Sequence, residues 1–143
     1  MIPRVYLPSL AELIDRLCIC QLKAVFIPEH YEAYEREILL IMQDITTILD
    51  EKSQEGFIFD GKDVRAVIVL MLTNRYIWEN ESRARAGGSE QDKLLKLTHA
   101  INGVRSRAKN AISEGMGGDR KDHKIDCLAA ETTKEFGNWN IPL

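Results

Sequence analysis

Tyrosine and isoleucine residues recur at alternating steps of three and four between Glu29 and Lys52, and this spacing constrains the fold more than any other feature of the chain. Such steps place side chains along one face of an α-helix, whereas a strand needs alternation at every second residue. A seam with this period packs against another helix. The pattern therefore predicts a long helix within a bundle. The seam consists of Tyr31, Tyr34, Ile38, Ile41, Ile45 and Ile48.

The segment before this helix has the same period and a clear start. Ser9-Leu10-Ala11-Glu12 is a capping box, in which the first and last side chains bind backbone N–H groups at the beginning of a helix. This helix runs to about Ile27, because Pro28 cannot continue it but can open the next one. The sequence leaves open whether the two helices form one rod bent at Pro28 or fold back on each other.

Two further helices follow, separated by a pair of glycines. Asp60-Gly61 marks a turn before a third helix that reaches about Ala86. It is the most apolar of the four, so we expect it to lie at the centre of the bundle. Gly87-Gly88 ends it, and Ser89, with an aspartate three residues later, caps a fourth helix that stops at Gly115.

These segments predict an all-α protein, an antiparallel bundle of about four long helices. A chain of 143 residues buries enough apolar surface to fold as a single domain, 1–143, without metal or disulfide staples. Residues 115–143 form a glycine-linked C-terminal extension with a short helix and an extended tail. The regular seam and the apolar tail also predict a homo-oligomer, because one small bundle is not expected to cover both. Whether the tail packs in cis or on a neighbour stays open.

The composition points to the cytoplasm. The three cysteines are an odd number, and Cys18 and Cys20 lie inside an apolar helical pattern, as free thiols do in a reducing compartment. The longest unbroken apolar run, residues 66–72, is far shorter than the roughly 20 residues that span a bilayer. No secretory signal pattern precedes the first helix. We therefore expect neither secretion nor membrane insertion.

Charge is unevenly distributed along the chain, although the net charge is only -3. Residues 1–82 carry 8 basic and 14 acidic side chains, and residues 83–124 carry 10 and 5. The basic stretch suits subunit docking, phosphate or nucleic acid, or is simply a solvated helix face. Nucleic-acid binding is the weakest of these hypotheses, because interleaved aromatic residues are missing and the pI is about 5.6. Its candidate residues are Arg83, Arg85, Arg105, Arg107, Lys109, Arg120, Lys121 and Lys124.

Strong catalytic and metal-binding motifs are missing, and we expect no metal and no cofactor. All-helical nucleotide pyrophosphatases hold magnesium with Glu-x-x-Glu on one helix and Glu-x-x-Asp on another. Glu32 and Glu35 satisfy the first half, but Glu79 is followed three residues later by Ser82, so the second half fails. The spacing of Asp119, Asp122, His123 and Asp126 fits either a cation site or, as three basic neighbours favour, a polar first turn of a helix.

Polar residues interrupt the apolar face of the third helix and mark the candidate site. Asn74, Trp78 and Glu81 follow one another at steps of four and three, so they lie along one stripe. Buried amides and carboxylates need partners. Polar residues on the neighbouring helices are candidates for these partners. The site is either a closed network with a Glu81–Arg105 pair or an anion-binding site that Arg105 faces. The predicted set is Asn74, Trp78, Glu81, Asn102, Arg105, Lys23 and Asp15.

Several short sequence motifs resemble those of a poorly characterised all-helical family found in phages and bacteria, including hypothetical proteins of tailed marine phages. The resemblance covers about residues 9–114. It implies a helical fold and a phage origin, and it implies no mechanism. The matching motifs are Glu12-Leu13-Ile14-Asp15-Arg16-Leu17 followed by Leu22-Lys23, then Asn74 with Ile77-Trp78 and Glu81, then Asn102-Gly103-Val104-Arg105.

The function is inferred mainly by elimination of other protein classes. The leading hypothesis is a non-catalytic oligomeric protein that binds a protein partner or a small anionic ligand, such as a nucleotide or phosphate, in the host cytoplasm. The alternative is a hydrolase or transferase for a phosphorylated or nucleotide substrate, with Glu79 or Glu81 as acid or metal ligand and Arg105 holding phosphate. The sequence does not identify the ligand or the order of the oligomer.

Overall fold

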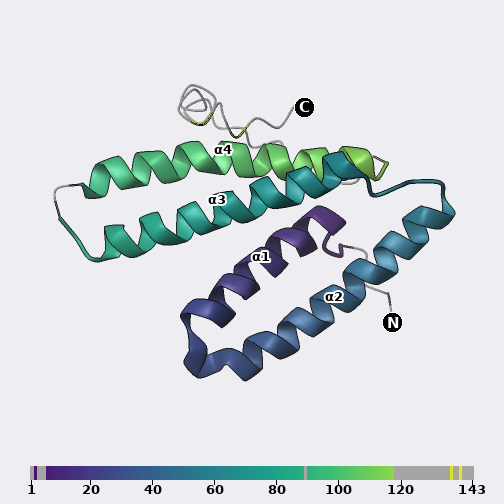
Figure 1. The fold of residues 1–143 in the computed structure, drawn as a ribbon, viewed down its shortest axis with the longest axis horizontal. Helices are drawn as coiled ribbons and strands as arrows, with labels where there is room; N and C mark the ends of the chain where they lie inside the picture. Colours follow the sequence, from purple (N-terminus) through teal and green to yellow (C-terminus); the bar gives the residue numbers. More distant parts are fainter. Residues whose placement is uncertain (1, 3–5, 89, 118–135, 137–138, 140–143) are drawn as a thin grey trace.

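The computed structural model describes residues 2, 6–88, 90–117, 136 and 139, and these form an all-α bundle of four long helices (Figure 1). Within these residues there is no strand. The predicted fold class is therefore confirmed. The helices are α1 (Leu10–Phe26), α2 (Tyr31–Gln54), α3 (Gly61–Arg85) and α4 (Gln91–Gly115), and a short 3-10 turn, η1 (Pro28–His30), joins α1 to α2.

Two helical hairpins build the bundle. In the first, α1 and α2 fold back on each other around Pro28, so the alternative of one bent rod is wrong (Figure 1). The isoleucine seam of α2 packs in this hairpin: Ile38 and Ile41 are buried against Leu13 and Cys20 of α1. In the second hairpin α3 and α4 run antiparallel along their whole length. The isoleucines of the seam are thus largely covered within the chain and no longer argue for an oligomer, whereas Tyr31 at its start is 51% exposed.

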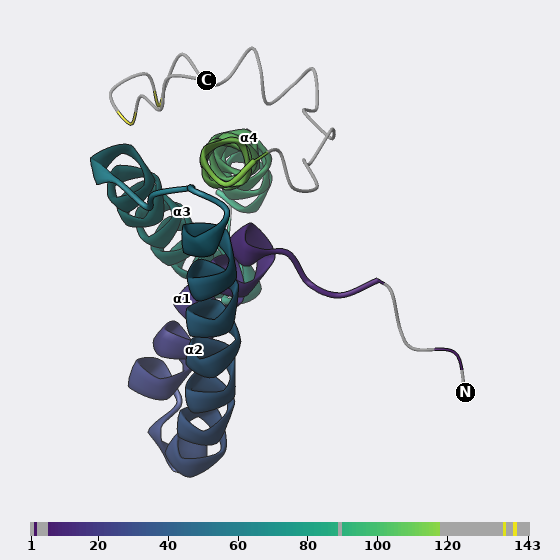
Figure 2. The ribbon, with the colours of Figure 1, turned by 90° about the vertical axis from the view of Figure 1, so that its right-hand side faces the viewer.

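The centre of the bundle is α1, not α3 as we predicted. This helix packs against α2, α3 and α4, whereas α2 packs mainly on α1 (Figures 1 and 2). More than half of its residues are buried, and they face in several directions. The main core lies where Leu10 and Ile14 of α1 meet Leu70 of α3 and Ile101 of α4. One face of α3 stays in solvent.

Local capping explains where the helices begin. The Ser9 hydroxyl accepts a hydrogen bond from the Glu12 N–H at 3.2 Å, as the capping box predicts. At α3 the Asp60 carboxylate accepts from two N–H groups of the first turn, and Asp63 accepts in return from the Asp60 N–H at 3.0 Å. Helix α4 begins later than expected, with Glu90 at the N-cap and without a side-chain cap from that residue.

The described part of the C-terminal extension packs in cis. Phe136 is buried, and its ring contacts Tyr76 of α3 edge to face, with centroids 5.4 Å apart. Trp139 contacts the same tyrosine at 6.0 Å. Such edge-to-face aromatic pairs add stability beyond their apolar burial. At least these two aromatic side chains are therefore covered by their own chain, and the predicted short helix lies outside the described residues.

The ends of α3 and α4 approach each other closely at Gly115. A Cβ atom there would lie 2.5 Å from Oδ1 of Asp63, the buried carboxylate that caps α3. Gly115→Ala should therefore displace Asp63 and destabilise the protein by about 1–3 kcal/mol in urea unfolding. Gly61→Ala, where a Cβ meets nothing within 4 Å, is the control and should change stability by less than about 0.5 kcal/mol. Equal effects of the two variants would contradict this contact.

Candidate functional site

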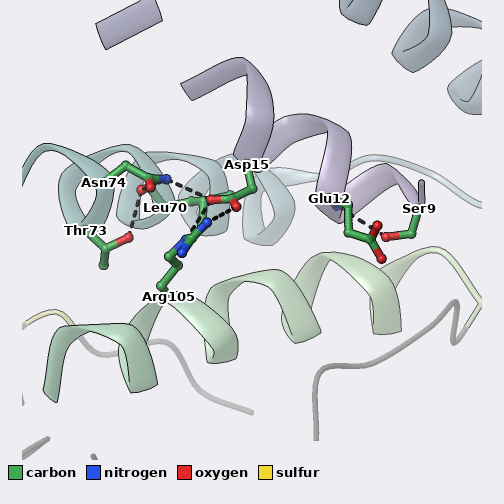
Figure 3. A network of polar contacts seen from close by, with 7 residues as sticks. All are labelled: Ser9, Glu12, Asp15, Leu70, Thr73, Asn74 and Arg105. Carbon is green, nitrogen blue, oxygen red and sulfur yellow. Dashed lines mark hydrogen bonds and ion pairs between the residues drawn. The ribbon is translucent and has the colours of Figure 1, made fainter. Parts of the chain in front are cut away.

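A buried polar network joins α1, α3 and α4 at the carboxylate of Asp15 (Figure 3). Arg105 of α4 donates to it from two nitrogens: Nε lies 2.9 Å from Oδ1, and Nη2 binds Oδ2. Asn74 of α3 donates from Nδ2 to Oδ1 at 2.8 Å. Three of the seven predicted site residues therefore meet, although they lie up to 90 positions apart in the sequence.

Each partner in this network is held by its own helix. The Asn74 amide also donates to the Leu70 carbonyl at 3.0 Å, so both of its N–H bonds are used. Thr73, which is fully buried, donates to the same carbonyl at 2.8 Å (Figure 3). The Asp15 side chain is only 8% exposed, and that of Arg105 is 28% exposed. A carboxylate in this position is stable because an arginine fork and an amide replace its water.

The network is closed, so it has the structural rather than the ligand-binding form of the prediction. We expected Arg105 to pair with Glu81 or to face an anion. Instead Nε and Nη2 of its guanidinium donate to Asp15, while Glu81 is exposed and pairs with Arg85 one turn further along α3, at 3.8 Å. The predicted Glu81–Arg105 pair is wrong. Asp15 is the shorter and more deeply buried acid, and it lies opposite Arg105 because α1 packs directly on the second hairpin, formed by α3 and α4.

Two of the remaining predicted residues, Trp78 and Lys23, make contacts at other helix interfaces. Trp78 packs on Phe26 at the end of α1, with ring centroids 5.9 Å apart. Lys23 points toward α2, where its Nζ lies 5.9 Å from the centroid of the Tyr34 ring. Asn102 is half-buried on α4, one turn before Arg105. Trp78 therefore belongs to the α1–α3 interface and Lys23 to the α1–α2 interface.

A shallow cleft of about 260 Å³ opens between the end of α3 and the start of α4. Glu81 and Arg85 line one side of it, and Gln91, Leu95 and Thr98 line the other. Asn80, at its base, is 3% exposed, and its Nδ2 has no hydrogen-bond partner. The cleft holds one acid and one base, so its charge favours neither anions nor cations.

The candidate catalytic acids lie in solvent and are paired on their own helix. Glu79 binds Arg75 at 2.8 Å, and both are partly exposed. The Arg75 guanidinium also lies 4.4 Å from the centroid of the Phe26 ring. Among the described residues no group of three or more His, Cys, Asp or Glu side chains could hold a metal ion. The Asp119–Asp126 candidate lies outside these residues.

Exposed apolar side chains form two stripes that the sequence analysis missed. On α3, Val64, Ile68 and Leu72 succeed one another one turn apart and are 49%, 55% and 51% exposed. On α2, Leu39 and Met42 are 57% and 49% exposed. The sequence did contain a signal for the α2 stripe, since positions 32, 35, 39, 42, 46 and 49 repeat the period of the buried seam one residue later.

None of the described helices has the length and apolar character needed to cross a bilayer.

Comparisons of the chain with protein-family models, with curated protein sequences and with solved structures find no match. Function is therefore inferred from the geometry of the described residues. That geometry consists of a closed polar network, a small cleft of balanced charge and two exposed apolar stripes.

The closed network predicts a large effect of removing its cation. Arg105→Ala leaves the Asp15 carboxylate buried without its main partner, and should lower the free energy of unfolding by about 3 kcal/mol, the lower end for a buried pair because the guanidinium is partly hydrated. Arg16→Ala is the matched control, since Arg16 makes a similar pair with Glu37 in solvent, at 2.7 Å. That change should cost less than about 1 kcal/mol. A comparable loss in both variants would contradict the structural role of Asp15.

The two described cysteines should be inert. Burial, with a smaller contribution from Asp15, raises the pKa of the Cys18 thiol to about 11, and burial raises the pKa of Cys20. At pH 8 roughly one Cys18 in a thousand is then the reactive thiolate. In a Cys127→Ser protein, a thiol-specific reagent should react about a hundredfold more slowly with the native than with the unfolded chain. Equal rates would contradict the burial of both thiols.

Proposed function

We propose that this chain is a non-catalytic, self-associating helical protein that works by binding protein surfaces. The observation that carries the proposal is the apolar stripe Val64, Ile68 and Leu72 on the solvent face of α3. Large contiguous apolar patches are rare on monomers and are typical of protein interfaces. The stripe lies on a helix of about seven turns that packs against α1 and α4.

Phe26 extends this surface toward the end of α1. Its ring is 44% exposed and lies between Trp78 and Arg75, which contact it from α3. Arginine and aromatic residues are enriched among the few interface residues that contribute most of the binding free energy. The stripe therefore has an apolar centre and a flank of the residue types that anchor partners.

A protein partner is better supported than the other candidates. The anion site predicted from the sequence depends on Arg105, and Asp15 already binds Arg105 through both oxygens. The predicted hydrolase or transferase would use Arg105 to hold phosphate, whereas Arg105 binds Asp15 and the candidate acid Glu79 is paired with Arg75 on the surface. The proposed setting, the cytoplasm of a phage-infected host, rests on the sequence resemblance alone.

A single substitution on α3 tests the proposal. Ile68→Glu places a charge at the centre of the stripe, where burial against a partner would be costly, and should weaken self-association at least tenfold in sedimentation equilibrium. Leu95→Glu is the matched control, because this α4 side chain is 46% exposed and lies outside the stripe. It should leave the association constant within twofold. A wild-type protein that stays monomeric at 100 µM, roughly the Kd scale of weak interfaces, would contradict self-association.

A further inference from the structure

The apolar stripe of α2 lies on a helix of nearly the same length as α3, and the charged residues beside the two stripes are opposite in sign. Leu39 and Met42 share one face of α2 with Glu32 and Glu35, at steps of three and four. This face lies beside the seam that packs on α1, so it stays exposed when the hairpin is formed. Helix α2 has 24 residues and α3 has 25.

The charges of the two helices are complementary. Helix α2 carries six acidic and two basic side chains, whereas α3 carries five basic and three acidic ones. On α3, exposed Arg65 lies one turn from Ile68, and partly exposed Arg75 lies just beyond Leu72. A pair of two α3 stripes would carry an excess of positive charge on both sides, and a pair of two α2 stripes would carry an excess of negative charge on both sides. Opposite charges across an interface favour the mixed pair over both like pairs.

We infer that the occupant of the α3 stripe is α2 of a second copy of this chain. The inference deepens the proposed function and rests on it. In a twofold dimer, α2 of each copy contacts α3 of the other, so the contact forms twice. Stable interfaces bury about 1,200–2,000 Å² in total, and forming the helix pair twice doubles the area that one such pair provides. Within the chain, α2 packs on α1 and leaves the α3 stripe uncovered (Figure 1).

The two exposed leucines of α2 offer a matched pair of variants. Leu39 lies on the stripe, whereas Leu40 is 65% exposed and points about 100° away around the same helix. We expect Leu39→Arg to lower the association constant of the full chain at least tenfold in sedimentation equilibrium, and Leu40→Arg to change it less than twofold. Circular dichroism checks that each variant is folded, and Met42→Arg replaces Leu39→Arg if that variant does not fold.

Mixing variants separates this arrangement from others. Leu39→Arg and Ile68→Glu chains should associate with each other more tightly than either does with itself, because a mixed pair keeps one intact α2–α3 contact. If Ile68→Glu is monomeric while Leu39→Arg associates like the wild type, α2 is not the occupant and the inference fails, although the proposed function stands. If the Leu40→Arg chain is as weak as Leu39→Arg, the inference also fails. A monomeric wild type overturns both.

Discussion

The bidentate ion pair between Asp15 and Arg105 is the interaction on which the arrangement of the helices depends. It is the point where α1, α3 and α4 share hydrogen bonds, and Asn74 completes it. A charged carboxylate that is almost fully buried cannot tolerate a shift of either partner, because its desolvation is balanced only by this geometry. The network therefore fixes how the first hairpin sits on the second, while the apolar core supplies most of the stability.

Placing α1 at the centre has a consequence for the surface. Because α1 packs against both α2 and the second hairpin, α2 and α3 each keep a face that no other described helix covers. A four-helix bundle with a common core would have buried both faces. Because α2 and α3 each have apolar residues on a second face, this open arrangement leaves that face exposed as a candidate surface for association.

The candidate site could be predicted from the sequence only in part. Asn74, Arg105 and Asp15 were identified because a polar residue in an apolar seam needs a partner, and Arg105 and Asp15 were among the candidates on the neighbouring helices. Glu81 was assigned to the same network on spacing alone, but near its helix end it lies in solvent and pairs with Arg85. Spacing identifies the face of a helix on which a residue lies. It does not say whether that residue lies within the contact with the next helix or beyond its end.

The sequence by itself determined the all-α class and, to within a few residues, the bounds of four helices, because periodicity, capping residues, proline and glycine act over a single turn. It also determined that Asn74, a polar residue in an apolar seam, needs a buried partner. Only the tertiary structure decided that Asp15 is that partner, that α1 is central, and that the isoleucine seam is covered within the chain. These outcomes depend on which helices pack together, and contacts between residues up to 90 positions apart are set by the packing of the whole chain rather than by local spacing.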